Sequence, residues 1–286
     1  MLGFLSRKFA IISQKEAQVL NRFIYYFALP ALFIAKVAKI NLEQLELKLV
    51  ISLLLPILMI LMLLWVGFQV LKIINKDQFI LFSLAIIFGS NSFFGVAFFE
   101  SLAGKAGLDF AVIASAVLGP IGVFLCMVLF EYQAGQMGIR SFGQKMLKNP
   151  LIISIFIGML FFVFGLQDSF LIKAFTLLGK SAGPTAIFTL GIFVYDNFSV
   201  QALKKSAFYA LFRLIVLPVV TVFLVFLLNI SGEIKEFLIL QSGLPAAVAI
   251  AVFAEKYDYK KDIISNIVII TSVFCFVVLG ILAFFV

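Results

Sequence analysis

Apolar runs of about 20 residues recur along this sequence from near residue 17 to the C-terminus, separated only by short charged or turn-rich segments. A helix needs roughly 20 mostly apolar residues to cross the hydrocarbon core of a bilayer, so each run is long enough to span it. Because 64% of the residues are hydrophobic and only 13% are charged, the chain has too little polar surface for a water-soluble fold. The sequence therefore predicts an all-α polytopic membrane protein without a soluble domain.

The apolar runs predict about nine transmembrane helices. They lie at residues 17–38, 47–72, 78–102, 108–132, 150–166, 170–196, 203–229, 234–254 and 262–286. The formal net charge of +8 comes from basic residues scattered between these runs, which is typical of topology determinants and argues against nucleic acid as a partner. Cys126 and Cys275 both lie inside apolar runs, so we expect no disulfide, no metal site and no cofactor.

Landmarks in the two halves of the chain are related by a nearly constant offset. Pro30 and Pro184 are 154 residues apart, and Glu100 and Glu255 are 155 residues apart. The order of helices therefore repeats after about residue 150, and we predict that the first repeat occupies 1–149 and the second 150–286.

An odd number of helices per repeat gives the two repeats opposite orientations in the membrane, as in many secondary transporters. In a plan of five helices per repeat, the first helix lacks most of its length, because only Met1–Leu5 is apolar before Arg7. We expect the start of this helix to lie upstream of the assigned start, and the alternative is a degenerate protein that lacks most of this helix.

Lys and Arg are distributed unevenly between the two sides that this helix order defines. Thirteen fall on one side, including Arg140 and Lys145, and six fall on the other. This comparison leaves out three that lie within helices: Arg22, Lys180 and Arg213. Cytoplasmic loops carry the excess of positive charge. We therefore predict a multi-pass protein of the cell inner membrane with its C-terminus on the extracytoplasmic side.

Two predicted helices are interrupted at corresponding places, at Phe88–Ser92 in the third and at Gln241–Pro245 in the eighth. Gly and Pro weaken a helix, and unpaired backbone at membrane depth is tolerated only where it faces protein or a watery cavity. The free N–H groups at the start of a half-helix attract an anion. We therefore predict a substrate site at the two breaks, formed by Gly89, Ser90, Asn91, Ser92, Gly95, Gln241, Ser242, Gly243 and Pro245. The alternative is that both breaks are ordinary kinks, like those predicted at Pro30 and Pro184.

Several other polar residues leave two interpretations open. Arg213 lies either inside the membrane as a functional charge or near the cytoplasmic surface, which its side chain reaches by snorkelling. Glu100 and Glu255 are predicted to be interfacial anchors, with proton coupling as the alternative. A further group either lines the same cavity or bonds neighbouring helices: Ser115, Gly119, Pro120, Asn266, Thr271 and Ser272.

Several stretches, in order along the chain, resemble motifs of the auxin efflux carrier family. They are Asn21–Leu32, Gly89–Ala97, Asn149–Ile153, Leu244–Val248 and Ala254–Tyr257. Together they cover essentially the whole chain. The chain departs from the family pattern at Ala97, where the family has a proline, and at Ser90, where it has an asparagine; Asn91 follows one place later.

The resemblance implies ten helices in two inverted repeats of five, with a scaffold domain and a transport domain. It also implies that the fourth and ninth helices break and cross, and that the substrate binds beside the crossing. The family's substrates are small organic anions. The resemblance therefore implies a secondary transporter of mono- or dicarboxylates, such as malate, malonate or auxin-like acids, that works by alternating access in the lipid bilayer, with a homodimer as a further expectation.

Other function classes fit the sequence less well. A channel needs a continuous polar ring across the membrane, and the predicted helices hold few polar residues. An enzyme needs catalytic or metal-binding groups, and the chain has no histidine. Leu178–Ser181 resembles the end of a P-loop, but Ala174 stands where that motif needs glycine. A non-transporting sensor or scaffold and a carrier like the sodium-coupled bile-acid symporters remain as alternatives, and coupling to H⁺ or Na⁺ stays open.

Overall fold

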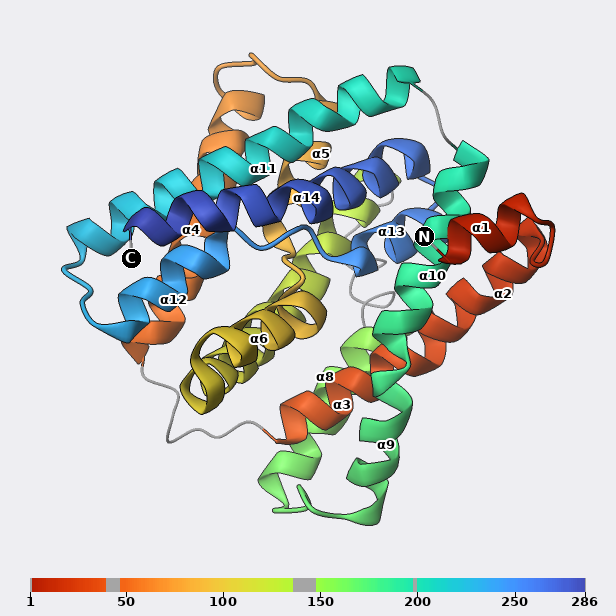
Figure 1. The fold of residues 1–286 in the computed structure, drawn as a ribbon, viewed down its shortest axis with the longest axis horizontal. Coiled ribbons are helices and arrows are strands. Elements are labelled where there is room, and N and C mark those ends of the chain that lie inside the picture. Colours follow the sequence, from red (N-terminus) through yellow and green to blue (C-terminus); the bar gives the residue numbers. More distant parts are fainter. Residues whose placement is uncertain (1, 40–46, 136–147, 198–199, 286) are drawn as a thin grey trace. The chain divides into compact units, whose positions relative to one another are not determined.

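The computed structural model describes residues 2–39, 47–135, 148–197 and 200–285 (Figure 1). These residues form helices joined by short turns, and within them the β-structure is limited to one isolated bridge. The prediction of an all-α polytopic fold is confirmed. Arg140 and Lys145, which entered the charge comparison, lie outside the described residues.

The chain runs through the helices in the following order. They are α1 Leu2–Lys8, α2 Gln14–Phe23, α3 Leu29–Ala38, α4 Leu47–Gln69, α5 Lys76–Ile87, α6 Val96–Gln133, α8 Pro150–Val163, α9 Phe170–Lys180, α10 Ala182–Asn197, α11 Val200–Leu227, α12 Glu233–Ser242, α13 Val248–Lys256 and α14 Lys261–Leu282. Two π-helical turns, Ile24–Ala28 and Asn91–Gly95, lead into α3 and α6, and a 3-10 turn at Ala283–Phe285 follows α14.

Every segment predicted from the apolar runs contains helix in the described part of the chain. Five helical stretches are long and apolar enough to cross a membrane: Gln14–Ala38, Leu47–Gln69, Asn91–Gln133, Gln201–Leu227 and Lys261–Phe285. The predicted interruption between residues 102 and 108 falls inside α6, where Ala103 and Gly104 leave the helical conformation. Gly104 has a φ of 55°, a left-handed conformation that strains residues with a Cβ atom.

The chain folds into two compact units. Unit 1 contains Met1–Ile40, Phe130–Ala202 and Val248–Ser265, and unit 2 contains Asn41–Leu129, Leu203–Ala247 and Asn266–Val286. Each unit therefore draws segments from both predicted repeats, 1–149 and 150–286. The division of the sequence into two inverted repeats stays a prediction.

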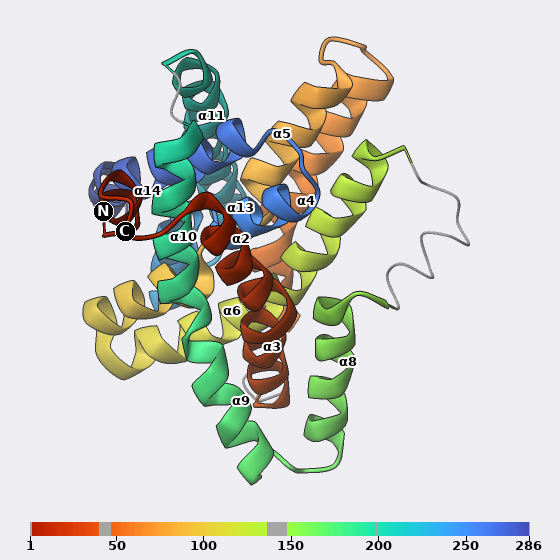
Figure 2. The same ribbon diagram turned by 90° about the vertical axis from the view of Figure 1, so that its right-hand side faces the viewer.

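Close helix packing in unit 1 depends on small residues. Helix α3 packs against α8 and α9 (Figure 2), and a Cβ atom on Gly158 of α8 would lie 2.8 Å from the Cβ atom of Val37. A Cβ atom on Gly179 of α9 would lie 2.7 Å from the Cα atom of Leu32. Glycines allow the helix backbones to approach this closely, as is common between membrane helices.

The prolines and Asn149 mark helix starts in unit 1. Pro30 lies at the start of α3, directly after the π-helical turn, and Pro184 lies in the first turn of α10. Asn149 caps α8 by accepting a hydrogen bond from the Leu151 N–H, and its Nδ2 donates to the hydroxyl of Tyr25 at 2.7 Å. The motif around Asn149 thus joins two helices of the same unit.

Candidate functional site

In unit 2 the two predicted helix breaks lie side by side. Helix α5 ends at Ile87 and α12 ends at Ser242, and the extended residues after each helix form an antiparallel bridge between Gly89 and Ala246. The N–H of Ser90 donates to the carbonyl of Pro245 at 2.9 Å. The N–H of Ala247 donates to the carbonyl of Phe88 at 2.8 Å. Each break thus supplies hydrogen-bond partners to backbone groups that the other break leaves unpaired. Buried backbone groups need such partners.

A positively charged side chain from a third helix, α11, lies at these joined breaks. Arg213 of α11 is 2% exposed. Its guanidinium donates to the carbonyls of Leu244 and Pro245 at 3.0 to 3.3 Å, to that of Ile86 at 3.1 Å, and to that of Ala85. Carbonyl groups at the end of a helix carry partial negative charge and lack intrahelical partners, so the guanidinium fork satisfies several of them at once.

Arg213 makes no ion pair with a carboxylate in the part of the chain that the structure describes. Its charge is compensated by carbonyl dipoles instead. The Arg213 side chain is buried inside the protein, which argues against snorkelling to a surface. Its place at membrane depth as a functional charge stays a prediction. The sequence places this charge in a helix but contains no indication of which carbonyls it meets.

Space around the guanidinium is small. Gln241 donates from Nε2 to Oδ1 of Asn91 at 3.0 Å, and Nδ2 of Asn91 is buried without a hydrogen-bond partner in the described part of the chain. A Cβ atom on Gly89 would lie 2.9 Å from Nη2 of Arg213, so glycine leaves room for the arginine. The cavity bordered by these four residues has a volume of about 10 Å³, which is enough for about one water molecule.

The remaining residues of the predicted site are placed differently. Ser242 donates its hydroxyl to the carbonyl of Ile239 within its own helix, and Gly243 packs against α14, where its Cβ atom would lie 2.8 Å from Leu282. Ser90 and Pro245 take part through their backbones, while Ser92 and Gly95 lie in the π-helical turn before α6. The structure therefore gathers Gly89, Asn91 and Gln241 around Arg213.

Helix α14 also supports the break that follows α12. The N–H of Ala246 donates to the hydroxyl oxygen of Thr271 at 3.1 Å, and this hydroxyl donates back to carbonyls of its own helix. Of the two roles that the sequence left open for Thr271, the structure shows the helix-bonding one. Ser272, its neighbour, bonds only the carbonyl of Val268 in its own helix.

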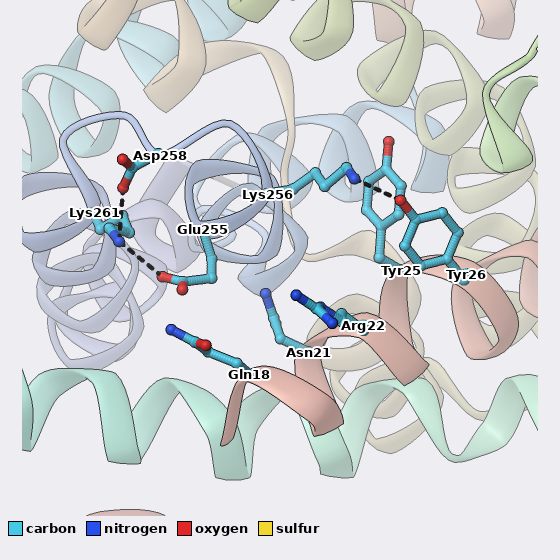
Figure 3. A pocket seen from close by; sticks show the side chains of 9 residues that line it. All are labelled: Gln18, Asn21, Arg22, Tyr25, Tyr26, Glu255, Lys256, Asp258 and Lys261. Atoms are coloured by element: carbon cyan, nitrogen blue, oxygen red, sulfur yellow. Dashed lines mark hydrogen bonds and ion pairs between the residues drawn. The ribbon is translucent and has the colours of Figure 1, made fainter. Parts of the chain in front are cut away.

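Unit 1 holds a second, larger polar pocket (Figure 3). Its volume is about 530 Å³, which lies within the range of small-molecule sites. Side chains from α2, the π-helical turn, the end of α13, the turn after it and the first residue of α14 surround it. The lining residues are Gln18, Asn21, Arg22, Tyr25, Tyr26, Glu255, Lys256, Asp258 and Lys261.

Charges in this pocket are separated into two groups. Lys261 forms ion pairs with both acidic residues of the pocket, at 3.6 Å from Glu255 and 2.8 Å from Asp258. The hydrogen bond from Lys261 holds the pKa of the Asp258 carboxyl below its ordinary value. Lys256 lies on the other side of the pocket, where it donates to the Tyr26 hydroxyl and sits over the Tyr26 ring at 5.0 Å (Figure 3).

Two polar groups of α2 have unused bonding capacity at this pocket. Arg22 is exposed and lines the pocket without an ion pair among the described residues. Asn21 is 4% exposed, and its Oδ1 has no hydrogen-bond partner within the residues that the structure describes, although its Nδ2 donates to the carbonyl of Val252. The sequence prediction of the site missed Arg22 and Lys256. Arg22 and Lys256 lie in two stretches that resemble family motifs, Asn21–Leu32 and Ala254–Tyr257. These motifs are the sequence signal that could have found them.

Known proteins similar to this chain are membrane transporters and a signaling protein. Residues 1–283 match the family described as Membrane transport protein. The chain is 27% identical to an uncharacterized transporter of Methanocaldococcus jannaschii, over 98% of this chain and 93% of that protein. It is 29% identical to auxin efflux carrier component 1 of Arabidopsis thaliana, over 44% of this chain and 21% of that carrier. It is 25% identical to the lysosomal cholesterol signaling protein of Mus musculus, over 95% of this chain and 34% of that protein.

The family match extends over nearly the whole chain, including both breaks and the pocket of unit 1. The similarity to an auxin efflux carrier agrees with the motifs quoted from the sequence, so the predicted resemblance is confirmed. The chain belongs to the membrane transport protein family and is a membrane transporter related to the auxin efflux carriers.

Proposed function

We propose that this transporter carries small organic anions, namely mono- and dicarboxylates such as malate, malonate or auxin-like acids, across the cell inner membrane. The observation that supports this cargo most directly is Arg213, a buried cation held at two joined breaks without a carboxylate partner among the described residues. A charge in a low-dielectric interior acts on an anion more strongly than the same charge in water. The name of the Arabidopsis relative, an auxin efflux carrier, points to the same class of cargo.

The breaks are the proposed binding site. Asn91 and Gln241 supply amide groups there, and Nδ2 of Asn91 is a buried donor without a partner among the described residues. Donors of this kind suit a carboxylate, which only accepts hydrogen bonds. Of the residues predicted from the sequence, we propose that Gly89, Asn91 and Gln241 contact the cargo. Ser90 and Pro245 hold the two breaks together through their backbone hydrogen bond.

Transport at this site requires alternating access. The cavity of about 10 Å³ is far too small for an organic acid, so the surroundings of Arg213 must separate for a carboxylate to enter. Broken helices that cross near the middle of the membrane are a known means of exposing one site to each side in turn. We infer that the joined breaks act as this crossing, with the bridge between Gly89 and Ala246 as its centre.

The pocket of unit 1 is a candidate for the first encounter with cargo. Arg22 and Lys256 provide positive charge on one side of it, while Lys261 pairs with both of its carboxylates, so that three basic and two acidic side chains line the pocket. A carboxylate that pairs with Arg22 gains charge-assisted hydrogen bonds. The volume of about 530 Å³ accommodates a dicarboxylate or an aromatic acid.

Flux measured in proteoliposomes tests the proposal. Uptake of labelled malate, malonate and indole-3-acetate is compared between wild type, Asn91→Ala and Pro245→Ala. The control is Ser101→Ala, because Ser101 is exposed and bonds only its own helix. We expect saturable uptake in wild type and the control, and a loss of about 10- to 100-fold in Asn91→Ala, since a hydrogen bond to a charged group contributes about 1.5–3 kcal/mol. Absence of flux for every anion in a well-folded preparation would sink the proposal.

A sensor is the second candidate function, and the mouse relative is the observation that favours it. That protein is named for cholesterol signaling, and its similarity extends over 95% of this chain. A sensor binds its ligand without moving it across the membrane. Saturable binding of an anion or a sterol to the purified protein, together with zero flux in the proteoliposomes, supports this candidate over the carrier.

A further inference from the structure

The carbonyl oxygens at the joined breaks resemble the ligand set of a monovalent cation. Oxygens of Ala85 and Ile86 at the end of α5, and of Leu244 and Pro245 after α12, converge on one place. Unwound backbone carbonyls and the C-terminal ends of half-helices are the groups with which secondary transporters coordinate Na⁺. In this chain the place is filled by the guanidinium of Arg213.

The guanidinium occupies this set of carbonyls, and a second cation beside it would compete for the same oxygens. It donates to all four carbonyls, it is 2% exposed, and the cavity beside it has a volume of about 10 Å³. No carboxylate bonds it among the described residues, so a second positive ion there would meet uncompensated repulsion at short range. The guanidinium lies so close to Gly89 that a Cβ atom there would be 2.9 Å from Nη2, so the absence of a side chain at residue 89 leaves room for it.

We propose that Arg213 is a tethered cation that fills a monovalent-cation site built from these four backbone carbonyls, so that the carrier needs no dissociable cation at its breaks. The inference deepens the proposed function, because it concerns what accompanies the cargo at the same site. It implies that Na⁺ does not bind at the breaks of the wild type. It also implies that removal of the arginine side chain opens a site that free guanidinium or Na⁺ can occupy.

Thermal unfolding of the purified full chain in detergent tests the inference without any cargo. Wild type, Arg213→Ala and the exposed control Lys204→Ala on the same helix are melted in choline chloride, NaCl or LiCl at equal ionic strength, with and without millimolar guanidinium chloride. We expect the Tm of wild type and control to be the same in all these salts. Arg213→Ala should melt about 5 °C or more lower in choline, and guanidinium or Na⁺ should restore part of that loss.

Two results overturn the inference. The first is stabilisation of the wild type by Na⁺ relative to choline, because a free cation would then bind while Arg213 is in place. The second is an Arg213→Ala protein whose Tm is equally low in every salt. If Arg213→Ala yields no folded protein, Arg213→Gln, which keeps donors without the charge, takes its place with the same expected response to cations. Because the readout is Tm, it stays valid whether or not any anion is transported.

Discussion

At the scale of single residues, the site depends on one charge and on the absence of one side chain beside it. Burying a charge costs free energy unless fixed dipoles or charges compensate it. Arg213 is compensated by carbonyls at the ends of two helices. This arrangement requires the guanidinium to lie close to the backbone of the first break, which is possible because residue 89 is glycine.

Replacement of Gly89 by alanine tests this requirement. The added Cβ atom would lie 2.9 Å from Nη2 of Arg213, so the guanidinium must move and lose part of its hydrogen bonding. We expect the free energy of unfolding to fall by about 1–3 kcal/mol, as for other overpacked sites, and anion flux to fall with it. Gly280→Ala is the matched control, since a Cβ atom at that position would meet nothing within 4 Å. Equal Tm values for the two variants would contradict the packing argument.

The pocket of unit 1 gives a separate prediction at this scale. Arg22→Gln and Lys256→Gln each remove a positive charge from the side of the pocket away from Lys261. If the cargo meets this pocket first, KM should rise about 3- to 10-fold while the maximal rate changes little, because a charge-assisted hydrogen bond is lost before the transport step. Lys15→Gln, on the same helix but outside the pocket, should leave KM unchanged.

At the scale of helices, the breaks are held by their neighbours. Helix α11 supplies Arg213, and α14 supplies the hydroxyl of Thr271 to the N–H of Ala246. A break in a membrane helix exposes backbone groups that the surrounding hydrocarbon cannot satisfy. Each of these two helices therefore stabilises an irregular segment that would otherwise carry unpaired donors and acceptors.

Thr271→Val isolates the contribution of α14. Valine keeps the shape of threonine but removes the acceptor, which leaves the buried N–H of Ala246 unpaired. We expect a loss of about 1–3 kcal/mol in unfolding free energy, measured as a lower Tm or a lower midpoint in denaturant. Ser272→Ala on the next position removes only a bond within its own helix, and it should change Tm much less. If Ser272→Ala lowered Tm more than Thr271→Val, Thr271 would not support the break.

The helices and both breaks could be predicted from the sequence, because hydrophobic length and the Gly and Pro positions are local properties. The break inside α6 at Gly104 also falls where the sequence predicts a gap between apolar runs. The site itself was predicted less completely. The sequence around Arg213 does not indicate its carbonyl partners, because they belong to segments far away in the chain. Likewise, nothing around Arg22 indicates which distant residues line the same pocket. Ser242 was predicted to face the site, yet its hydroxyl is taken up by the carbonyl of Ile239 one turn earlier.

At the scale of the whole molecule, each compact unit combines segments from both halves of the chain. An inverted repeat folded in this way supplies each unit with equivalent elements in opposite orientation, which is the basis of alternating access in many carriers. The repeat and the orientation are both predictions, and they share one testable consequence. Loops after successive spans must alternate between the two sides of the membrane in the order that the lysine distribution predicts.

Single cysteines placed in these loops test the predicted orientation. Lys15→Cys is expected in the cytoplasm and Lys173→Cys outside, and both positions are exposed. Cys126 and Cys275 are buried, so they should react poorly with a membrane-impermeant thiol reagent, and a variant with both replaced by alanine is the control. In intact spheroplasts we expect labelling at position 173 alone, with position 15 labelled only after lysis, because cytoplasmic loops carry the excess of Lys and Arg. The reverse pattern would place the C-terminus in the cytoplasm, and labelling of both positions from outside would contradict the predicted odd number of spans between them.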